Sequence, residues 1–283
     1  MRALLSRLEK DPRYAQLLVL GSLLLYGIAY LDFSLPALAV PLTVGFACLV
    51  ERLQFRWRRA PDRPRPPYES AAISALSTLL LLRSTEVWVY LAVVLVAVLS
   101  KSLIRIQGRH FVNPTNGAVL FGAAFLPAWI TNGQWGHGVL FAFLLGTCGW
   151  LVTTRAGRLD SALAFLGGLL FFGVLRTLIF GYRWPVLLHL FENGALWLFA
   201  FYMVTDPRTT PDRRAHRVLH AVLVAGLTMT LIQFFYVRDS FLWALLALAP
   251  LVPALNWLTL RTRRSQAEPT SGGPNVVSAF ARA

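Results

Sequence analysis

Two segments of this chain combine helix-ending residues with polar side chains that could bind a ligand. The first is residues 101–129, in which a basic stretch leads into Asn113-Pro114. Proline suits the first turn of a helix, where its missing N–H is not needed, and asparagine can cap that turn. Gly117, one turn further on, lets a neighbouring backbone or a flat ligand come close. The segment indicates either a ligand contact or simply a well-capped helix.

The second segment is residues 191–217, where an apolar run ends at Thr205-Asp206-Pro207. A carboxylate is costly in hydrocarbon and proline cannot continue a helix, so we expect a helix to end here. Thr209 and the arginines that follow add hydroxyl and guanidinium groups. These groups could bind a phosphate or the edge of a flavin ring, or they could only end a helix and face water.

Ionisable side chains inside apolar runs are functional candidates by default. Glu192 precedes Asp206 by 14 residues, which is ~21 Å along an ideal helix. One interpretation is an ion pair between Glu192 and Arg176. The other is a path in which Glu192 and Asn193 coordinate Na⁺ or relay protons.

Other chemistries find little support in the sequence. Cys48 and Cys148 lie in apolar runs with no ligand at metal spacing, which argues against a disulfide or a zinc site. The histidines suit membrane interfaces better than a pair of haem ligands on facing helices. We therefore expect no metal, and no catalytic triad or phosphate-binding loop is recognisable.

The elements that position these residues must be membrane helices. Hydrophobic residues make up 56% of the 283 residues and charged residues only 14%, against roughly 25% charged in soluble domains. The net charge is +14, with 27 Lys and Arg against 13 Asp and Glu, but the charges stand between long apolar runs. This distribution argues against a nucleic-acid binder and predicts an all-α polytopic membrane protein.

Apolar runs predict about ten transmembrane helices, since a crossing needs about 20 apolar residues and fewer where a helix is broken or shielded. They lie near 14–31, 35–50, 70–82, 86–100, 111–128, 138–154, 161–181, 186–205, 217–237 and 240–258. The third and fourth are short and are separated only by Arg83–Glu86. One long helix over 70–100 is the alternative, but it would place the charged side chains of Arg83 and Glu86 deep in lipid.

The basic residues predict the orientation. With ten crossings both termini share one side, and 23 of the 27 Lys and Arg fall there. By the positive-inside rule this side is cytoplasmic, and one crossing more or fewer would scramble the asymmetry. We therefore predict a multi-pass protein of the cell (inner) membrane with both termini in the cytoplasm. Asn113-Pro114 and Thr205-Asp206 then lie on the same side, where they could meet.

The predicted organisation is a cytoplasmic segment 1–13, a ten-helix membrane domain 14–260 and a disordered cytoplasmic tail 261–283. The Arg- and Pro-rich loop 51–69 is expected to be irregular and to lie against anionic headgroups. Ten crossings also divide into five plus five. An odd number per half gives halves of opposite orientation, the arrangement of an inverted repeat whose sites form at interrupted helices.

The two motifs, in this order and spacing over residues 65–258, resemble the RnfD/NqrB family of membrane proteins from Rnf-type electron-transport complexes. That family has an F-N-P-A-like helix entry and an A-T-D-P helix end, which here become residues 112–115 and 204–207. The basic residues before the first motif are similar too: Lys101, Arg105 and Gly108-Arg109. The chain is also similar to the shorter UnbU-type relatives of RnfD.

The resemblance implies a flavin-bearing electron-transfer subunit that works with other membrane or redox subunits. The motif residues become candidates for a non-covalent FMN or riboflavin site: Asn113, Pro114, Gly117, Thr205, Asp206 and Thr209. Relatives with covalent FMN attach it to the threonine of an S/D-G-A-T motif in the outer loop after the fifth span. Here that loop, residues 129–137, has no Gly-Ala-Thr, and Thr131 lacks the surrounding pattern. We do not expect covalent FMN.

Three functions remain open. The first is a membrane subunit of a flavin-type electron-transport complex that possesses at most an electron-transfer activity. The second is a solute channel or transporter on the same scaffold without a redox cofactor. The third is an accessory or biosynthetic membrane protein that keeps only the fold.

Overall fold

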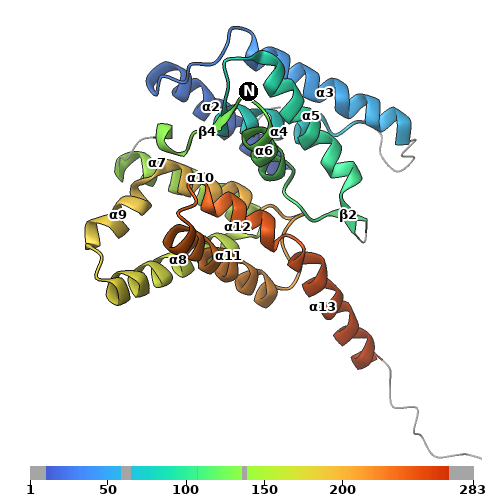
Figure 1. Cartoon of the computed structure of the whole chain (residues 1–283). Helices are drawn as coiled ribbons and strands as arrows, with labels where there is room; N and C mark the ends of the chain where they lie inside the picture. The colour runs from blue at the N-terminus through green and yellow to red at the C-terminus, as the bar shows by residue number, and fades with distance from the viewer. Residues whose placement is uncertain (1–10, 59–64, 107, 136–138, 268–283) are drawn as a thin grey trace, which may run out of the picture.

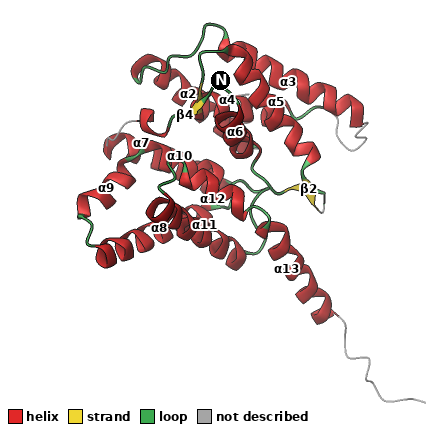
Figure 2. Ribbon diagram, viewed as in Figure 1, coloured by secondary structure: helices red, strands yellow, loops and turns green. Residues whose placement is uncertain are grey.

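A computed structural model of the chain describes residues 11–58, 65–106, 108–135 and 139–267. The predicted segment 1–13 and tail 261–283 lie largely outside these residues. Within the described parts the chain is mostly helical (Figures 1 and 2), as the composition predicts. A helical segment occupies each of the intervals predicted to cross the membrane.

The first half of the chain forms one group of packed helices, the upper part of Figure 1. It comprises α2 (Pro12–Tyr30), α3 (Ala39–Arg58), α4 (Tyr68–Leu81), α5 (Val87–Leu103) and α6 (Pro114–Phe125). α4 is central and packs against the other four. Close packing of α5 against α6 depends on Gly122, where a Cβ would lie 2.6 Å from Cγ2 of Val93.

The second half forms another group, which contains two interrupted helices. It comprises α7 (Val139–Arg155), α8 (Leu159–Phe180), α9 (Trp184–Glu192), α10 (Gly194–Leu198), the π-helical turn η2 (Phe199–Met203), α11 (Arg214–Phe235), α12 (Ser240–Leu248) and α13 (Leu251–Ala267). α8 and α11 form its most extensive pair, and a Cβ at Gly168 would lie 3.1 Å from that of Ala225. α13 extends away from the rest of the molecule (Figure 1).

The structure departs from the predicted all-α fold in a few short β-strands of two residues each. The strands β1 (Leu82–Arg83) and β4 (Trp129–Ile130) pair antiparallel, as do β2 (Arg105–Ile106) and β3 (Arg109–His110). The first pair, with the 3₁₀ turn η1 (Asn132–Trp135), joins the end of α4 to the segment after α6. The second pair leads from α5 into α6.

The predicted break at Arg83–Glu86 is confirmed, because α4 and α5 are separate helices rather than one. Arg83 is only 1% exposed. It donates to the backbone oxygens of Leu79 (2.6 Å) and Leu82 (2.8 Å) and to Oε1 of Gln134 (3.0 Å). Its guanidinium also lies 3.8 Å from the centre of the Phe33 ring. The charge is therefore enclosed by protein and binds the carbonyl end of α4.

Two predicted irregular segments are partly helical. Residues 51–58 of the predicted loop 51–69 continue α3, and α13 continues through Ala267 into the predicted tail. The prediction was wrong there because arginine is a good helix former and is favourable in the last turn of a helix, where Arg56 and Arg58 stand in α3. The prolines that motivated the loop begin only at Pro61.

The outer surface of the helices is apolar, as a lipid-facing surface must be. On α8 alone the exposed large side chains include Leu163, Leu170, Phe171, Leu178 and Ile179. Four described segments are long and apolar enough to cross a membrane: Arg13–Tyr30, Leu159–Phe180, Arg214–Phe235 and Ser240–Arg261. The chain is thus a multi-pass membrane protein. The count of ten crossings stays a prediction, because α6 has 12 residues and spans only ~18 Å.

The interruptions of the second half coincide with Asn193 and Pro250. α9 ends at Glu192, and the side chain of Asn193 then caps α10 by accepting from the N–H of Ala195 (2.9 Å). α12 ends before Ala249-Pro250, and α13 resumes at Leu251. Asn113-Pro114, in contrast, starts a helix rather than breaking one.

Candidate functional site

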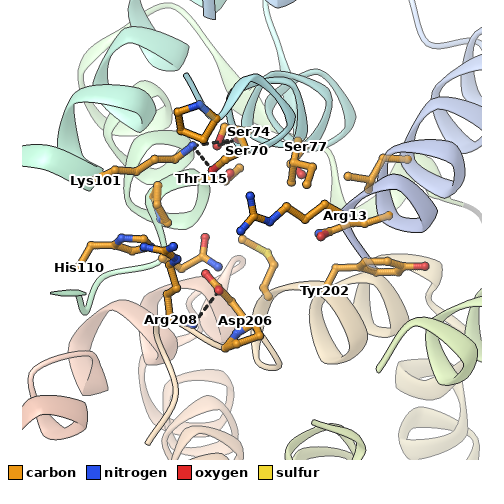
Figure 3. Close-up of a pocket in the computed structure, with 18 of the residues that line it drawn as sticks. Arg13, Ser70, Ser74, Ser77, Lys101, His110, Thr115, Tyr202, Asp206 and Arg208 are labelled. Atoms are coloured by element: carbon orange, nitrogen blue, oxygen red, sulfur yellow. Dashed lines mark hydrogen bonds between the residues drawn. The ribbon is translucent and has the colours of Figure 1, made fainter. Parts of the chain in front are cut away.

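A cavity of about 690 Å³ lies between the two helical groups. Residues from α2 to α6 line one side of it, and residues of α7, α10, η2 and the following turn line the other (Figure 3). Part of its wall is apolar, from Leu80, Leu81, Leu198, Phe201 and Met203. Because both groups contribute, the shape of the cavity depends on how the two halves of the chain pack together.

The two sequence motifs meet at this cavity. Asn113 and Pro114 line it from the start of α6, and Thr205 and Asp206 line it from the end of η2. The expectation that these segments lie together in space is therefore confirmed. Of the other candidates, Gly117 and Thr209 are not part of the wall. A Cβ at Gly117 would only contact Val112, and Thr209 is buried in the turn behind Asp206.

The start of α6 is fixed by capping, as predicted. Oδ1 of Asn113 accepts from the N–H of Asn116 (3.1 Å), and Pro114 occupies the first turn. Asn116 is fully buried, and its Nδ2 donates to the backbone oxygen of Leu242 in α12 (3.0 Å). This bond fixes the motif of the first group against the second.

The turn after η2 holds Asp206 at the edge of the cavity. Its Oδ1 accepts from the N–H of Arg208 (3.0 Å), and its backbone oxygen accepts from the hydroxyl of Thr210 (3.0 Å). The hydroxyl of Thr205 donates back to Phe201, which completes the helix end. The predicted helix termination is thus confirmed, and the carboxylate keeps one oxygen free of this turn.

Arginines hold the same turn from several directions. Arg109 donates to both carboxylate oxygens of Asp212 (2.7 and 2.9 Å) and to the backbone oxygen of Pro207 (2.9 Å). Arg158 donates to the backbone oxygen of Pro211 (3.1 Å). Arg109 belongs to the first group and the turn to the second, so this contact also joins the two halves beside the cavity.

His110 is the neutral member of the charged wall. It is 7% exposed and follows Arg109 in β3. Burial lowers its pKa to about 4, with Asp206 opposing that shift and the nearby cations Arg208, Lys101 and Arg105 adding to it. At neutral pH the imidazole is therefore uncharged and offers one N–H donor and one acceptor.

A row of hydroxyls on α4 also lines the cavity, and the sequence motifs did not indicate it. Ser70, Ser74 and Ser77 face the cavity because their spacing places them on one side of the helix (Figure 3). The ammonium of Lys101 donates to the backbone oxygen (2.9 Å) and the hydroxyl (3.0 Å) of Ser70. The i, i+4, i+7 spacing was visible in the sequence, but nothing there showed which side of α4 faces a cavity.

The predicted ion pair between Glu192 and Arg176 was wrong. Glu192 contacts Nδ1 of His189 (3.2 Å), and Arg176 donates to Oε1 of Gln233 and lies 4.3 Å from the centre of the Tyr182 ring. Neither residue lines the cavity, nor does Asn193. An ion path through Glu192 and Asn193 remains a prediction.

Comparison with known proteins supports the interpretation of the motifs. Residues 129–264 match the NQR2, RnfD, RnfE family. Over 147 residues the chain is 30% identical to a protein of Erwinia tasmaniensis whose name describes it as the D component of an ion-translocating oxidoreductase complex. That match covers 52% of this chain, which spans only 38% of the length of that relative. The family match includes Thr205-Asp206-Pro207 and begins after Asn113-Pro114. The predicted resemblance is confirmed over part of the chain: residues 129–264 are similar to the NQR2, RnfD, RnfE family.

Proposed function

We propose that this chain is a membrane subunit of an ion-translocating electron-transport complex and that it binds a flavin without a covalent bond. The observation that carries the proposal is that both family-like motifs line one cavity between the two halves of the chain. The name of the Erwinia tasmaniensis relative supports the class of complex. Further membrane or redox subunits are the implied partners.

The cavity fits a flavin in size and chemistry. Its volume of about 690 Å³ lies within the range of small-molecule sites, about 300–1,000 Å³. Leu80, Leu198 and Phe201 offer apolar surface for a flat ring. Asn113 and Asp206 offer polar groups for its edge. A bound flavin would supply one- and two-electron transfer. These side chains would orient the ring, and the carboxylate of Asp206 would accept a hydrogen bond from the N–H at the ring edge.

Covalent attachment is disfavoured by the structure of the outer loop. Thr131, its only threonine, is 4% exposed, and its hydroxyl donates to the backbone oxygen of Leu81 (3.2 Å). This hydroxyl is enclosed between β4 and the end of α4, so forming a phosphoester there would require the β1–β4 contact to open.

We also propose ten crossings arranged as an inverted five-plus-five repeat. In the first half α2 packs on α4, α3 on α4 and α5, and α5 on α6. In the second half α7 packs on α10 and η2, α8 on η2 and α11, and α11 on α12. With α9, α10 and η2 counted as one interrupted helix, the same order of contacts recurs, which supports the repeat.

The transporter alternative draws on the interruptions at Asn193 and Pro250, because transporters place sites at broken helices. These breaks do not line the cavity. Solute uptake into liposomes by the purified, flavin-free chain would favour that alternative over an electron-transport role.

The proposed crossings predict which positions share a side of the membrane. Single cysteines replacing Asn132 and Asp212, in a chain whose Cys48 and Cys148 are changed to alanine, should react with an impermeant maleimide from opposite sides. Asp212 should react from the cytoplasmic side, because it adjoins the basic segments. Labelling of both positions from the same side would contradict the ten-crossing topology.

The flavin proposal predicts a coloured protein. Purified in mild detergent, the chain should show flavin absorption in the blue and near ultraviolet. After denaturation and ultrafiltration, that flavin should pass into the filtrate. Release is expected because the proposed site contains no covalent bond. A colourless chain that takes up neither added FMN nor added riboflavin contradicts the proposal. Flavin that stays with the denatured chain contradicts its non-covalent part.

A further inference from the structure

The charged side chains around the cavity are mainly cationic. Five basic residues line it: Arg13, Arg58, Lys101, Arg105 and Arg208. Three acidic residues accompany them: Asp11, Glu51 and Asp206. Arg13 and Lys101 extend into the cavity from different sides, while Asp206 stands at its base (Figure 3). An excess of positive charge around an enclosed space favours an anionic ligand over a neutral one.

The backbone adds to this preference. α4 and α6 both start at the cavity, where Pro67 and Ser70 of one start and Asn113, Pro114 and Thr115 of the other form part of the wall. The start of a helix carries partial positive charge. At α4 this is the contribution that counts, because the N–H groups of Tyr68, Ser70 and Ala71 already donate to Pro66 and Pro67. The start of α4 has no side-chain cap, since Pro67 precedes it and makes no capping bond.

Donor groups gather on the α4 side of the cavity. Lys101 lies against Ser70 there. Gln54 of α3 is 8% exposed and lines the same cavity. Its Oε1 accepts from the hydroxyl of Ser102, and its Nε2 has no partner among the residues that the structure describes. A buried amide N–H without an acceptor is unfavourable unless a ligand supplies one.

From this arrangement we infer that the α4 side of the cavity is a site for a phosphate monoester, formed by Lys101, Nε2 of Gln54 and the hydroxyl of Ser70, with Arg13 facing it from another side of the cavity. The inference rests on the proposed flavin function and deepens it. The bound flavin is FMN, held without a covalent bond, and the cavity discriminates against riboflavin, which lacks the phosphate. The carboxylate of Asp206 repels phosphate, so it contacts the opposite end of the ligand, where the ring N–H is a donor.

The test compares the two flavins on one preparation. The full chain, stripped of flavin and placed in phosphatidylcholine nanodiscs to exclude anionic headgroups, is titrated with FMN and with riboflavin while flavin fluorescence is recorded. We expect FMN to bind at least about tenfold more tightly, because charge-assisted hydrogen bonds to a phosphate are strong. Inorganic phosphate should weaken FMN binding and leave riboflavin binding unchanged.

Variants assign the effect to the site. Lys101→Gln keeps a donor for Ser70 but removes the charge, and it should weaken FMN binding about tenfold without altering riboflavin binding. Lys101→Arg should retain most of the FMN affinity. Arg52→Gln is the matched control, because Arg52 is exposed on α3 outside the cavity wall; it should leave both affinities unchanged.

The outcomes separate this inference from the proposed function. Equal affinities for FMN and riboflavin, or equal losses in Lys101→Gln and Arg52→Gln, overturn the phosphate site and leave the flavin function standing. If neither flavin binds, the flavin function is contradicted. Calorimetry with inorganic phosphate then tests whether the cavity still contains an anion site. Phosphate binding that Lys101→Gln abolishes then supports the anion site, and absence of phosphate binding overturns it.

Discussion

Replacing Asp206 by alanine should weaken flavin binding at least about tenfold, whereas Arg213→Ala should change it less than about twofold. Asp206 lines the cavity, and its carboxylate anchors the turn through the N–H of Arg208. Arg213 belongs to the same loop but is exposed and lies outside the cavity wall. Fluorescence titration of both purified variants with FMN measures the difference.

A second substitution separates the charge of Asp206 from its structural role. Asn at this position can still accept from the N–H of Arg208, so Asp206→Asn should keep the turn and lose the anionic acceptor. We expect its flavin affinity to fall between those of the wild type and Asp206→Ala. If Asp206→Ala and Arg213→Ala behave alike, the turn serves only to end a helix.

The largest effect on stability is expected at Arg83. Arg83→Ala removes three hydrogen bonds and the contact with the Phe33 ring, and leaves buried carbonyls at the end of α4 without a donor. We expect the free energy of unfolding to fall by about 3 kcal/mol. Denaturant unfolding in detergent, followed by circular dichroism, measures the loss.

Arg183→Ala provides the matched control for Arg83. Like Arg83, Arg183 stands between two helices, but it is exposed and its side chain makes no capping bond to α9. Its replacement should change the free energy of unfolding by less than about 0.5 kcal/mol. If Arg83→Ala is as stable as the wild type, the guanidinium is not what binds the end of α4 to the outer loop.

Local signals in the sequence predicted the residues that start and end helices. Asn113-Pro114 and Thr205-Asp206-Pro207 act on their own helices, so their capping and terminating roles could be inferred without the rest of the fold. The break at Arg83 followed from the cost of charge in lipid. That argument did not reveal that Arg83 is enclosed by Phe33, Leu79 and Gln134, because Phe33 and Gln134 come from distant segments.

Contacts between helices could not be predicted from single segments. One of the two interpretations paired Arg176 with Glu192 of the next predicted helix, yet Arg176 on α8 donates to Gln233 on α11. To predict that the serines of α4 line a cavity, one would have to know which face of that helix borders the cavity. The rotation of a helix about its own axis is set by packing over its whole length, and an apolar membrane helix carries little polar asymmetry to indicate it.

The most direct test of the flavin site is titration of the stripped protein when its cavity is blocked. Ser77 lines the cavity and is half-buried, so Ser77→Trp should fill part of the space while an unchanged unfolding temperature shows that the fold is intact. The wild type should bind one equivalent of FMN per chain, and Ser77→Trp should bind at least about tenfold more weakly. No binding to the wild type, or equal binding to both proteins, would contradict a flavin site in this cavity.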